Sequence, residues 1–259
     1  MQAETRILHC KARQKMNSVA YGFRILIAFT IASSLFFNAA HAEDTKKGKA
    51  KGKESKKKWT ALFNGKTLDG WKKTKFGGEG DVLIKDGQLI LESGVDLTGV
   101  TWTKKDKLPL TNYEVYIEAK RVDGSDFFCG LTFPVKKKPC SLIVGGWGGG
   151  VCGLSSIDGG DASENETTTY KSFKKGQWYK IRLRVTDKRI EAWIDGKQIV
   201  DQDIVKRKID IRIEVELSKP FGLATWQTTA AIRKLQVRKL TKDELAALDK
   251  ADKKKREDE

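Results

Sequence analysis

The stretch Trp178–Val200, WYKIRLRVTDKRIEAWIDGKQIV, alternates apolar and charged residues over most of its length. Ile181, Leu183 and Val185 fall on one face of an extended chain, and the basic residues between them fall on the other. Two polar turns, the second at Asp195-Gly196, divide the stretch into three short strands. The pattern therefore predicts an antiparallel β-meander with one buried face and one solvated face.

The same period-two pattern recurs on both sides of this stretch. Further strands are expected on either side of an Asp86-Gly87 turn and over Tyr113–Val122, Phe127–Val135, Ser141–Trp147, Ile211–Leu217 and Ala231–Leu240. Ten or more short strands at this spacing predict an all-β jelly roll or β-sandwich. Within the strands, Trp178 and Trp193 are expected to lie in the core.

The N-terminal residues 1–42 are typical of a secretory signal peptide. Basic residues precede the apolar run Ile25–Phe37, and Ala40-His41-Ala42 has the small-x-small form of a cleavage site. The run is shorter than the about 20 residues that a membrane span needs, so cleavage after Ala42 is expected. Met16 is an alternative start. The mature protein is then secreted or periplasmic, with no membrane segment.

The chain after the signal divides into three parts. Residues 43–58 hold eight lysines against three acidic residues and predict a disordered linker. Residues 59–240 form the β-sandwich domain, and a charged helix or tail follows over 241–259. The capping box Thr241-Lys-Asp-Glu244 predicts that this helix is short and begins here. The linker either contacts anionic polymers or is a solubilising spacer; no specific nucleic-acid site is expected.

The histidine content excludes many enzyme classes. Both histidines, His9 and His41, lie in the predicted signal peptide. A mature chain without histidine cannot use a Ser-His-Asp or Cys-His mechanism, nor a histidine-ligated metal. Catalysis would have to use carboxylates, Lys, Tyr, Cys or an oxygen-ligated cation.

Three cysteines remain in the mature chain: Cys129, Cys140 and Cys152. An odd number allows at most one intramolecular disulfide, and the sequence does not say which pair would form it. The default expectation is that they are buried and act as small apolar residues.

Several motifs in this order resemble those of one family. They are Leu62-Phe-Asn-Gly-Lys-Thr-Leu-Asp-Gly-Trp71, Gly176-Gln-Trp-Tyr-Lys-Ile-Arg-Leu183, Ile190-Glu-Ala-Trp-Ile-Asp-Gly196, Gly222-Leu223 and Ile232-Arg-Lys-Leu-Gln-Val-Arg-Lys-Leu240. Together they resemble the 3-keto-disaccharide hydrolase domain, over roughly 59–240. The resemblance implies a concanavalin-A-like jelly roll, secretion, and cleavage of 3-keto-glycosides. The implied reaction removes the C2 proton, eliminates the C1 substituent and then adds water.

The chain departs from the pattern of typical members at two places. The position of a family glutamate holds Ser141, and a histidine expected near Gly222-Leu-Ala-Thr-Trp-Gln227 is missing. If those residues carry catalysis in the family, this chain uses other groups or has lost the reaction. The alternative function is a non-catalytic glycan-binding module of the bacterial cell envelope.

A loop rich in acidic residues offers replacement chemistry. Asp158, Asp161, Glu164 and Glu166 lie within nine residues and are the candidate catalytic groups. Their oxygens could also ligate a divalent cation such as Ca²⁺, although the spacing fits no EF-hand and the metal stays unknown. The plain alternative is a solvated acidic turn, in which case Asp126, Glu214 and Glu216 become the candidates.

Exposed aromatic residues supply the candidate substrate-binding surface. Trp147 stands among five glycines in Gly145–Gly150, where no regular strand would bury its indole. A flat aromatic ring in an open loop suits stacking on a sugar. Trp226 and Tyr170 are the further candidates for contact with a carbohydrate or glycan.

Overall fold

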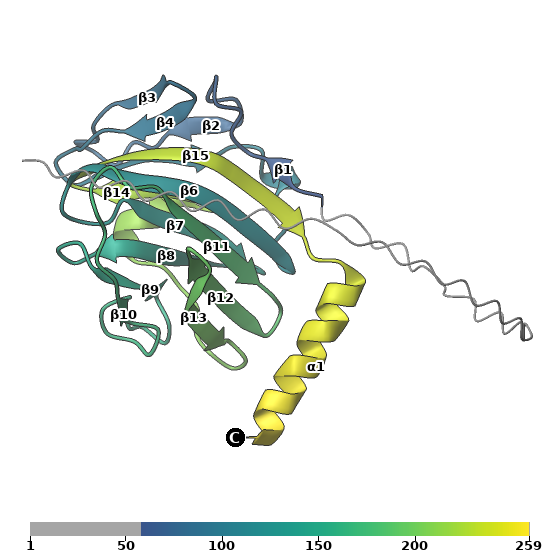
Figure 1. Cartoon of the computed structure of the whole chain (residues 1–259). Helices are drawn as coiled ribbons and strands as arrows, with labels where there is room; N and C mark the ends of the chain where they lie inside the picture. The colour runs from purple at the N-terminus through teal and green to yellow at the C-terminus, as the bar shows by residue number, and fades with distance from the viewer. Residues whose placement is uncertain (1–57, 259) are drawn as a thin grey trace, which may run out of the picture. The chain divides into compact units, whose positions relative to one another are not determined.

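The computed structural model describes residues 58–258. The predicted signal peptide and all of the predicted linker except Lys58 lie outside the described residues. The described part is an all-β sandwich of two antiparallel sheets followed by one C-terminal α-helix, as the sequence predicts (Figure 1).

The first sheet has eight strands in the order β13-β12-β11-β6-β15-β4-β3, with β1 beside β15. Their bounds are β1 Thr60–Ala61, β3 Val82–Lys85, β4 Gln88–Leu91, β6 Tyr113–Gly124, β11 Tyr179–Val185, β12 Arg189–Ile194, β13 Lys197–Asp203 and β15 Thr228–Lys239. The predicted meander is confirmed as β11, β12 and β13. Asp86 and Asp195 have φ values of 51° and 52°, so the two predicted Asp-Gly turns reach the left-handed region that hairpin turns need.

The second sheet has seven strands in the order β10-β9-β8-β7-β14-β5-β2. Their bounds are β2 Trp71–Lys73, β5 Leu97–Trp102, β7 Cys129–Val135, β8 Lys138–Gly146, β9 Val151–Ser155, β10 Thr169–Tyr170 and β14 Gly222–Trp226. A short 3-10 helix, η1 Lys105–Lys107, follows β5. The expected pairing of the strands around 127–135 and 141–147 is confirmed, since β7 and β8 form a hairpin.

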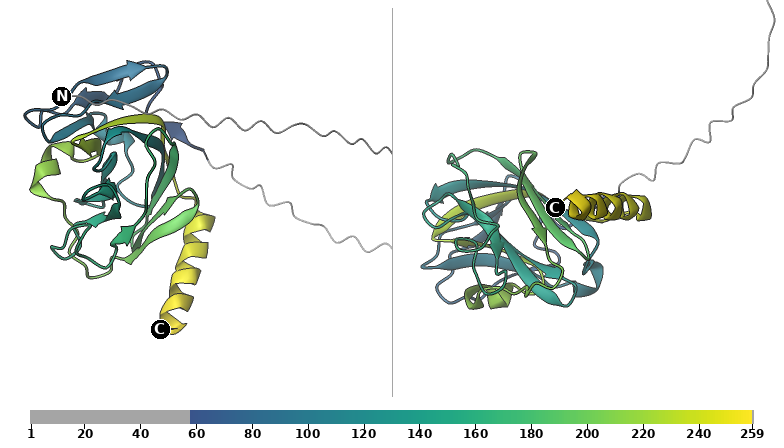
Figure 2. Two further views of the ribbon diagram at one scale, coloured as in Figure 1. Left: turned by 60° about the vertical axis from the view of Figure 1, so that its left-hand side comes forward. Right: turned by 90° about the horizontal axis from the view of Figure 1, so that it is seen from below.

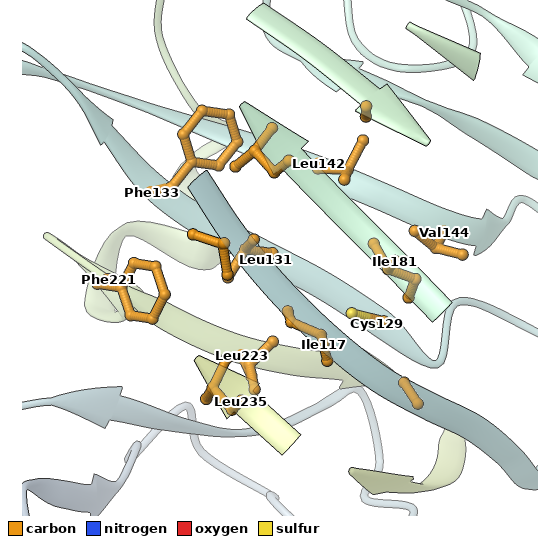
Figure 3. Packing of buried hydrophobic residues seen from close by; sticks show 14 of the residues in the cluster. Ile117, Cys129, Leu131, Phe133, Leu142, Val144, Ile181, Phe221, Leu223 and Leu235 are labelled. Atoms are coloured by element: carbon orange, nitrogen blue, oxygen red, sulfur yellow. The ribbon is translucent and has the colours of Figure 1, made fainter. Parts of the chain in front are cut away.

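The core lies between the two sheets, where alternate residues of each strand face inward. Ile117 and Ile181 from the first sheet pack with Leu131 and Leu142 from the second, and all four are at most 1% exposed (Figure 3). Because both sheets contribute aliphatic and aromatic side chains along their whole length, burial of apolar surface is the main source of stability.

One predicted strand is wrong. Residues 211–217 alternate charged and apolar side chains, but the chain forms a 3-10 helix, η2 Ile213–Ser218, that contacts β5 and β14. Ile213 is 85% exposed, so the alternation does not correspond to a buried sheet face. The segment crosses a sheet whose strands are already paired, and no strand partner is present for it among the described residues.

The expected burial of Trp178 and Trp193 is also wrong. Both are half-buried on the outer face of the first sheet, beneath basic side chains. The Arg182 guanidinium lies 3.8 Å from the centroid of the Trp193 ring, and that of Arg233 lies 4.1 Å from Trp178. Since Ile190, Ala192 and Ile194 face the core, the same alternation turns Trp193 outward to a cation–π contact.

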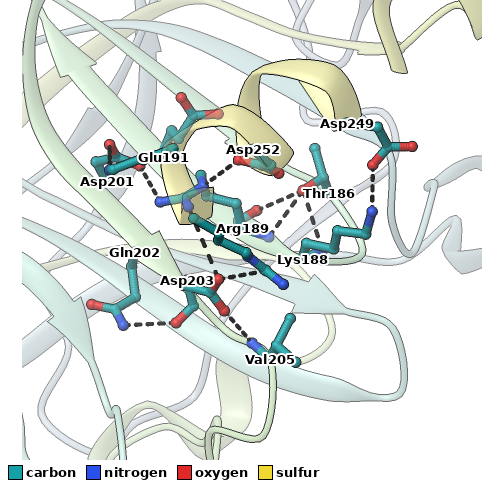
Figure 4. Close-up of polar contacts among 12 residues, drawn as sticks. Thr186, Lys188, Arg189, Glu191, Asp201, Gln202, Asp203, Val205, Asp249 and Asp252 are labelled. Atoms are coloured by element: carbon teal, nitrogen blue, oxygen red, sulfur yellow. Dashed lines mark hydrogen bonds and ion pairs between the residues drawn. The ribbon is translucent and has the colours of Figure 1, made fainter. Parts of the chain in front are cut away.

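The helix α1 Lys242–Asp258 confirms the predicted capping box. The backbone N–H of Glu244 donates to Thr241 Oγ1, and the N–H of Thr241 donates to Glu244 Oε2. Figure 2 shows α1, in yellow, alongside the sandwich and not between its sheets. Ion pairs hold it there: Arg189 contacts Asp252 at 2.8 Å, and further pairs join the helix to β13 (Figure 4).

The three cysteines are free and buried, as expected from the sequence. Burial raises the pKa of the Cys129 and Cys140 thiols to about 12.

We therefore expect no reaction with a thiol reagent at pH 8 in the native protein. After unfolding, all three thiols should react, and the absorbance of the released reagent group counts them. Because folding raises the pKa of these thiols, their contribution to the free energy of unfolding is fully present below the thiol pKa of the unfolded chain. It declines as the pH rises above that value. A thiol that reacts rapidly in the native state would contradict this burial.

Candidate functional site

The outer face of the second sheet, on the side away from the core, is hollowed by small residues. Gly99, Gly130 and Gly153 lie in one cross-strand row with Ala224 and Ile143. Two segments approach this face closely. A Cβ on Gly153 would lie 3.0 Å from the carbonyl oxygen of Ala162, and a Cβ on Gly222, in the neighbouring row, would lie 2.8 Å from that of Ser218 at the end of η2. The glycines therefore let the loop over 158–170 and η2 pack directly on the sheet.

A pocket of about 260 Å³ lies on this face, against the segment around η2. It is lined by side chains of four strands, of two loops and of the segment around η2: Leu97, Asp126, Phe127, Ser141, Ile143, Trp147, Ser155, Arg212, Glu214, Val215 and Trp226. Carboxylate, guanidinium, hydroxyl and indole groups thus converge on one apolar depression. Such a composition is typical of small-molecule sites.

Two serines supply the hydroxyls of the pocket. Ser141 on β8 and Ser155 on β9 lie directly opposite each other in the sheet. The Ser141 hydroxyl is 2.9 Å from Thr132 Oγ1, but Ser155 Oγ, on a side chain 1% exposed, has no hydrogen-bond partner among the described residues. An unsatisfied buried hydroxyl costs about 1–3 kcal/mol. Ser155 is therefore placed to bind a polar group that enters the pocket.

Asp126 presents an oriented carboxylate. Its Oδ1 accepts a hydrogen bond from the backbone N–H of Phe127 at 2.7 Å, and its Oδ2 accepts one from Gly148 at 2.9 Å. Within residues 58–258 no basic side chain forms an ion pair with this carboxylate. Each oxygen keeps lone pairs that can accept a proton or a ligand hydroxyl.

The Trp147 loop is fixed by a buried arginine. Arg121 on β6 is 5% exposed and donates hydrogen bonds of 3.0 Å to the carbonyl oxygens of Asp126, Gly145 and Gly149. Burial lowers the pKa of Arg121, and the carbonyl contacts compensate for its lost hydration. Trp147, 43% exposed, is therefore presented by a loop whose backbone Arg121 holds at two points and joins to the neighbouring loop at Asp126. Sequence reasoning missed Arg121, which lies 24 residues or more before the loop glycines that it holds.

Arg212 is held at the pocket by two carboxylates. Its Nη1 donates to Asp161 Oδ2 at 2.6 Å and its Nη2 to Glu214 Oε1 at 2.7 Å. The hydrogen bond from Arg212 lowers the pKa of Glu214. Burial acts to raise the pKa of Asp161, but hydrogen bonds from Ser163 and the Arg212 charge outweigh it and lower that pKa. Both acids are therefore anionic partners for Arg212 at neutral pH and weak bases.

None of the four sequence-predicted catalytic acids lines the pocket. Asp161 reaches it only through Arg212. Asp158 and Glu166 both pair with Arg207, and Glu164 is exposed. Of the three reserve candidates, Asp126 and Glu214 line the pocket, whereas Glu216 pairs with Lys219. No observation tests the catalytic role of any of these residues, so the four predicted acids stay predictions.

The aromatic candidates separate more clearly. Trp147 and Trp226 both line the pocket. Tyr170, at the end of the two-residue strand β10, is 75% exposed and lies outside the lining. The two tryptophans are thus the pair available for stacking on a ligand in this pocket.

The carboxylates of the acidic loop do not gather into one group among the described residues. In the part of the chain that the structure describes, no group of three or more His, Cys, Asp or Glu side chains is placed to hold a metal ion. Instead, Arg207 and Arg212 balance the charge of Asp158, Asp161 and Glu166.

No helix in residues 58–258 is long and apolar enough to cross a bilayer.

Comparison with known families identifies the domain. Residues 58–238 match the 3-keto-alpha-glucoside-1,2-lyase-like domain, which is most of the chain. The chain belongs to this family. The family resemblance seen in the sequence motifs is thereby confirmed, and the pocket lies in a domain of this carbohydrate-active family.

No curated protein matches the chain. Among solved structures, a glycosyl hydrolase of putative assignment from Parabacteroides distasonis is 15% identical, with 71% of this chain and 94% of that chain covered and a TM-score of 0.45. A Crh5 transglycosylase in complex with NAG is 12% identical, with 71% and 84% covered and a TM-score of 0.49. The carbohydrate recognition domain of Emp47p is 14% identical, with 73% and 100% covered and a TM-score of 0.47.

Proposed function

We propose that the protein is a secreted enzyme that cleaves 3-keto-glycosides by proton abstraction at C2 and elimination of the C1 substituent. The observation that supports this best is the pocket on the second sheet, which combines a carboxylate free of ion pairs, a fixed guanidinium and two indoles. Export is part of the proposal, because the residues that predict it, 1–42, lie outside the described structure.

The proposed reaction gives each group a role. A ketone at C3 acidifies the C2 proton, which passes to the Asp126 carboxylate while the electron pair forms an enolate whose oxygen lies towards Arg212. The enolate then re-forms the ketone, a C1=C2 double bond appears, and the C1–O bond breaks. Protonated Asp126 can return its proton to the departing oxygen. Water finally adds hydroxyl at C1 and hydrogen at C2.

Binding uses the remaining groups. Trp147 and Trp226 offer apolar faces to the sugar rings, and Ser155 offers an unpaired hydroxyl to a ring substituent. The proposed linker role, contact with anionic polymers through residues 43–58, is separate from this site and rests only on the lysine content of that segment.

A second candidate function is glycan binding without catalysis. It is favoured by Ser141, which occupies the family's glutamate position and lies in the pocket with no carboxylate beside it on β8. Turnover decides between the two functions. Purified protein is incubated with a 3-keto-glucoside and its unoxidised counterpart, with and without chelator, and release of the C1 substituent is measured. Binding of glycan with no release from any substrate would favour the binding module.

The stacking role gives a prediction that holds for both functions. We expect Trp147→Ala to weaken glycan binding about tenfold or more, because truncation of a central aromatic contact commonly removes over 1 kcal/mol. Tyr170→Ala is the matched control, since it deletes an exposed aromatic side chain outside the pocket. Calorimetric titration measures both. Equal losses in the two variants, or no loss in Trp147→Ala, would contradict the assignment of this pocket.

A further inference from the structure

A second depression lies at one end of the sandwich, away from the tryptophans. It has a volume of about 470 Å³ and is formed where the turn between β7 and β8 meets the loop after β13. Its lining is dominated by basic side chains: Val135, Lys136, Lys137, Lys138, Asp187, Ile204, Arg207, Lys208 and Ile209. We call it the basic cleft.

The single acid of the basic cleft is already satisfied. Asp187 accepts hydrogen bonds from Thr111 at 3.2 Å and from Asn112 at 3.0 Å, and it lies 3.5 Å from the Lys136 ammonium. Burial acts to raise the pKa of Asp187, but these contacts outweigh it and lower that pKa. The carboxylate is therefore ionised and shared with one lysine only, and it cannot neutralise the rest of the cleft.

Three lysines of the basic cleft form no ion pair among the described residues, and the charge of Lys208 acts only on Asp158, which Arg207 already pairs. Within residues 58–258, the ammonium groups of Lys137, Lys138 and Lys208 form no ion pair and no hydrogen bond, whereas Arg207 is paired with Asp158 and Glu166. Like charges gathered around one depression repel one another. An anion that enters the cleft would relieve this repulsion and accept charge-assisted hydrogen bonds.

The bottom of the basic cleft is apolar. Val135, Ile204 and Ile209 line it and belong to the core, with exposures of 5%, 9% and 7%. A bare inorganic ion would gain nothing from these aliphatic groups. A sugar ring that carries a carboxylate or a sulfate ester presents an apolar C–H face together with a charge, and so matches both parts of the lining.

The basic cleft and the pocket are close along the chain. Ile209 lines the cleft and Arg212 lines the pocket. Three residues of fully extended chain reach at most about 11 Å, which bounds the separation of these two Cα atoms. The linings of the two sites therefore come within the length of a short oligosaccharide of each other along this segment.

We propose that the basic cleft binds an acidic group, a carboxylate or a sulfate ester, on a glycan whose neighbouring units occupy the pocket. The occupancy of the pocket rests on the proposed function, whereas binding of the acidic group is independent of turnover. The substrate or ligand is accordingly an anionic glycan and not a neutral one.

Calorimetric titration at physiological ionic strength tests this proposal. The probes are an oligogalacturonate, a sulfated oligosaccharide, a neutral gluco-oligosaccharide and inorganic sulfate. We expect the purified protein to bind one of the acidic oligosaccharides more tightly than the other three probes. The variant Lys137→Gln/Lys138→Gln/Lys208→Gln should lose about tenfold or more of that affinity. Which acidic oligosaccharide responds distinguishes the carboxylate from the sulfate ester.

The matched control is Lys66→Gln/Lys72→Gln/Lys85→Gln, which removes the same charge from exposed lysines outside the cleft. It should lose less than about twofold, because exposed charges at a distance are screened by salt. Equal losses in the two triple variants would overturn the proposal, and so would equal affinity for acidic and neutral probes or for free sulfate. A failure of Asp126→Asn to affect turnover would overturn the proposed reaction and leave this binding result unchanged.

Discussion

Asp126→Asn is expected to lower kcat on a 3-keto-glucoside by about 10²- to 10⁴-fold, the range that a positioned general base contributes. The change keeps the shape and one oxygen of the side chain, so the contact with Gly148 or Phe127 can persist while the proton acceptor is lost. KM should change little, because the carboxylate acts in proton transfer more than in ground-state binding. Steady-state kinetics with an unchanged melting temperature would support the assignment.

The four acids predicted from the sequence provide the control panel. Asp158→Asn, Glu164→Gln and Glu166→Gln alter carboxylates outside the pocket lining and should keep most of the activity. Asp161→Asn is expected to lower activity only partly, since Asp161 acts by holding Arg212 at 2.6 Å. Loss of activity in Glu164→Gln or Glu166→Gln, together with an active Asp126→Asn, would return catalysis to the acidic loop and refute the role of Asp126.

Period-two patterning was sufficient to predict the sandwich because it depends on local chain geometry. In β11, Ile181, Leu183 and Val185 alternate with basic residues, and the structure buries these three. The same alternation misled over residues 211–217, where apolar residues again alternate with charged ones, yet the chain forms η2 and leaves Ile213 exposed. Alternation states which side chains share a face and says nothing of whether a neighbouring strand exists.

The pocket and the basic cleft depend on contacts between distant parts of the sequence. Arg212 meets Asp161 across 51 residues, and Arg207 meets Asp158 across 49. The acidic loop looked like a source of free carboxylates because nothing in its own sequence shows that these arginines neutralise it. Trp147 was predictable because its glycine neighbours leave no strand to bury it, whereas nothing in the sequence around Ser155 shows that its hydroxyl lacks a hydrogen-bond partner.

Arg238→Met is expected to lower the free energy of unfolding by about 3 kcal/mol, because it leaves a buried carboxylate without its main partner. Arg238 on β15 lies opposite Glu114 on β6, and both side chains are 3% exposed. Its Nε and Nη2 atoms donate to Glu114 Oε2 at 2.9 and 2.6 Å, and it also contacts Glu244 at the start of α1. In a domain of this size the melting temperature should fall by about 10 °C.

Two further variants distinguish the effect of breaking the buried ion pair from the effect of losing one positive charge. Lys175→Met removes an ammonium that pairs with Asp123 at 2.7 Å, but both side chains are exposed, so the melting temperature should stay nearly unchanged. Arg238→Met/Glu114→Met removes both charges and should be more stable than Arg238→Met alone, because the cost lies in the unpaired buried carboxylate and not in the missing ion pair. Thermal unfolding followed by circular dichroism measures all three. A double variant less stable than the single one would show instead that Glu114 stabilises the fold through Arg182 and Arg184, which lie 3.6 and 4.0 Å from its carboxylate.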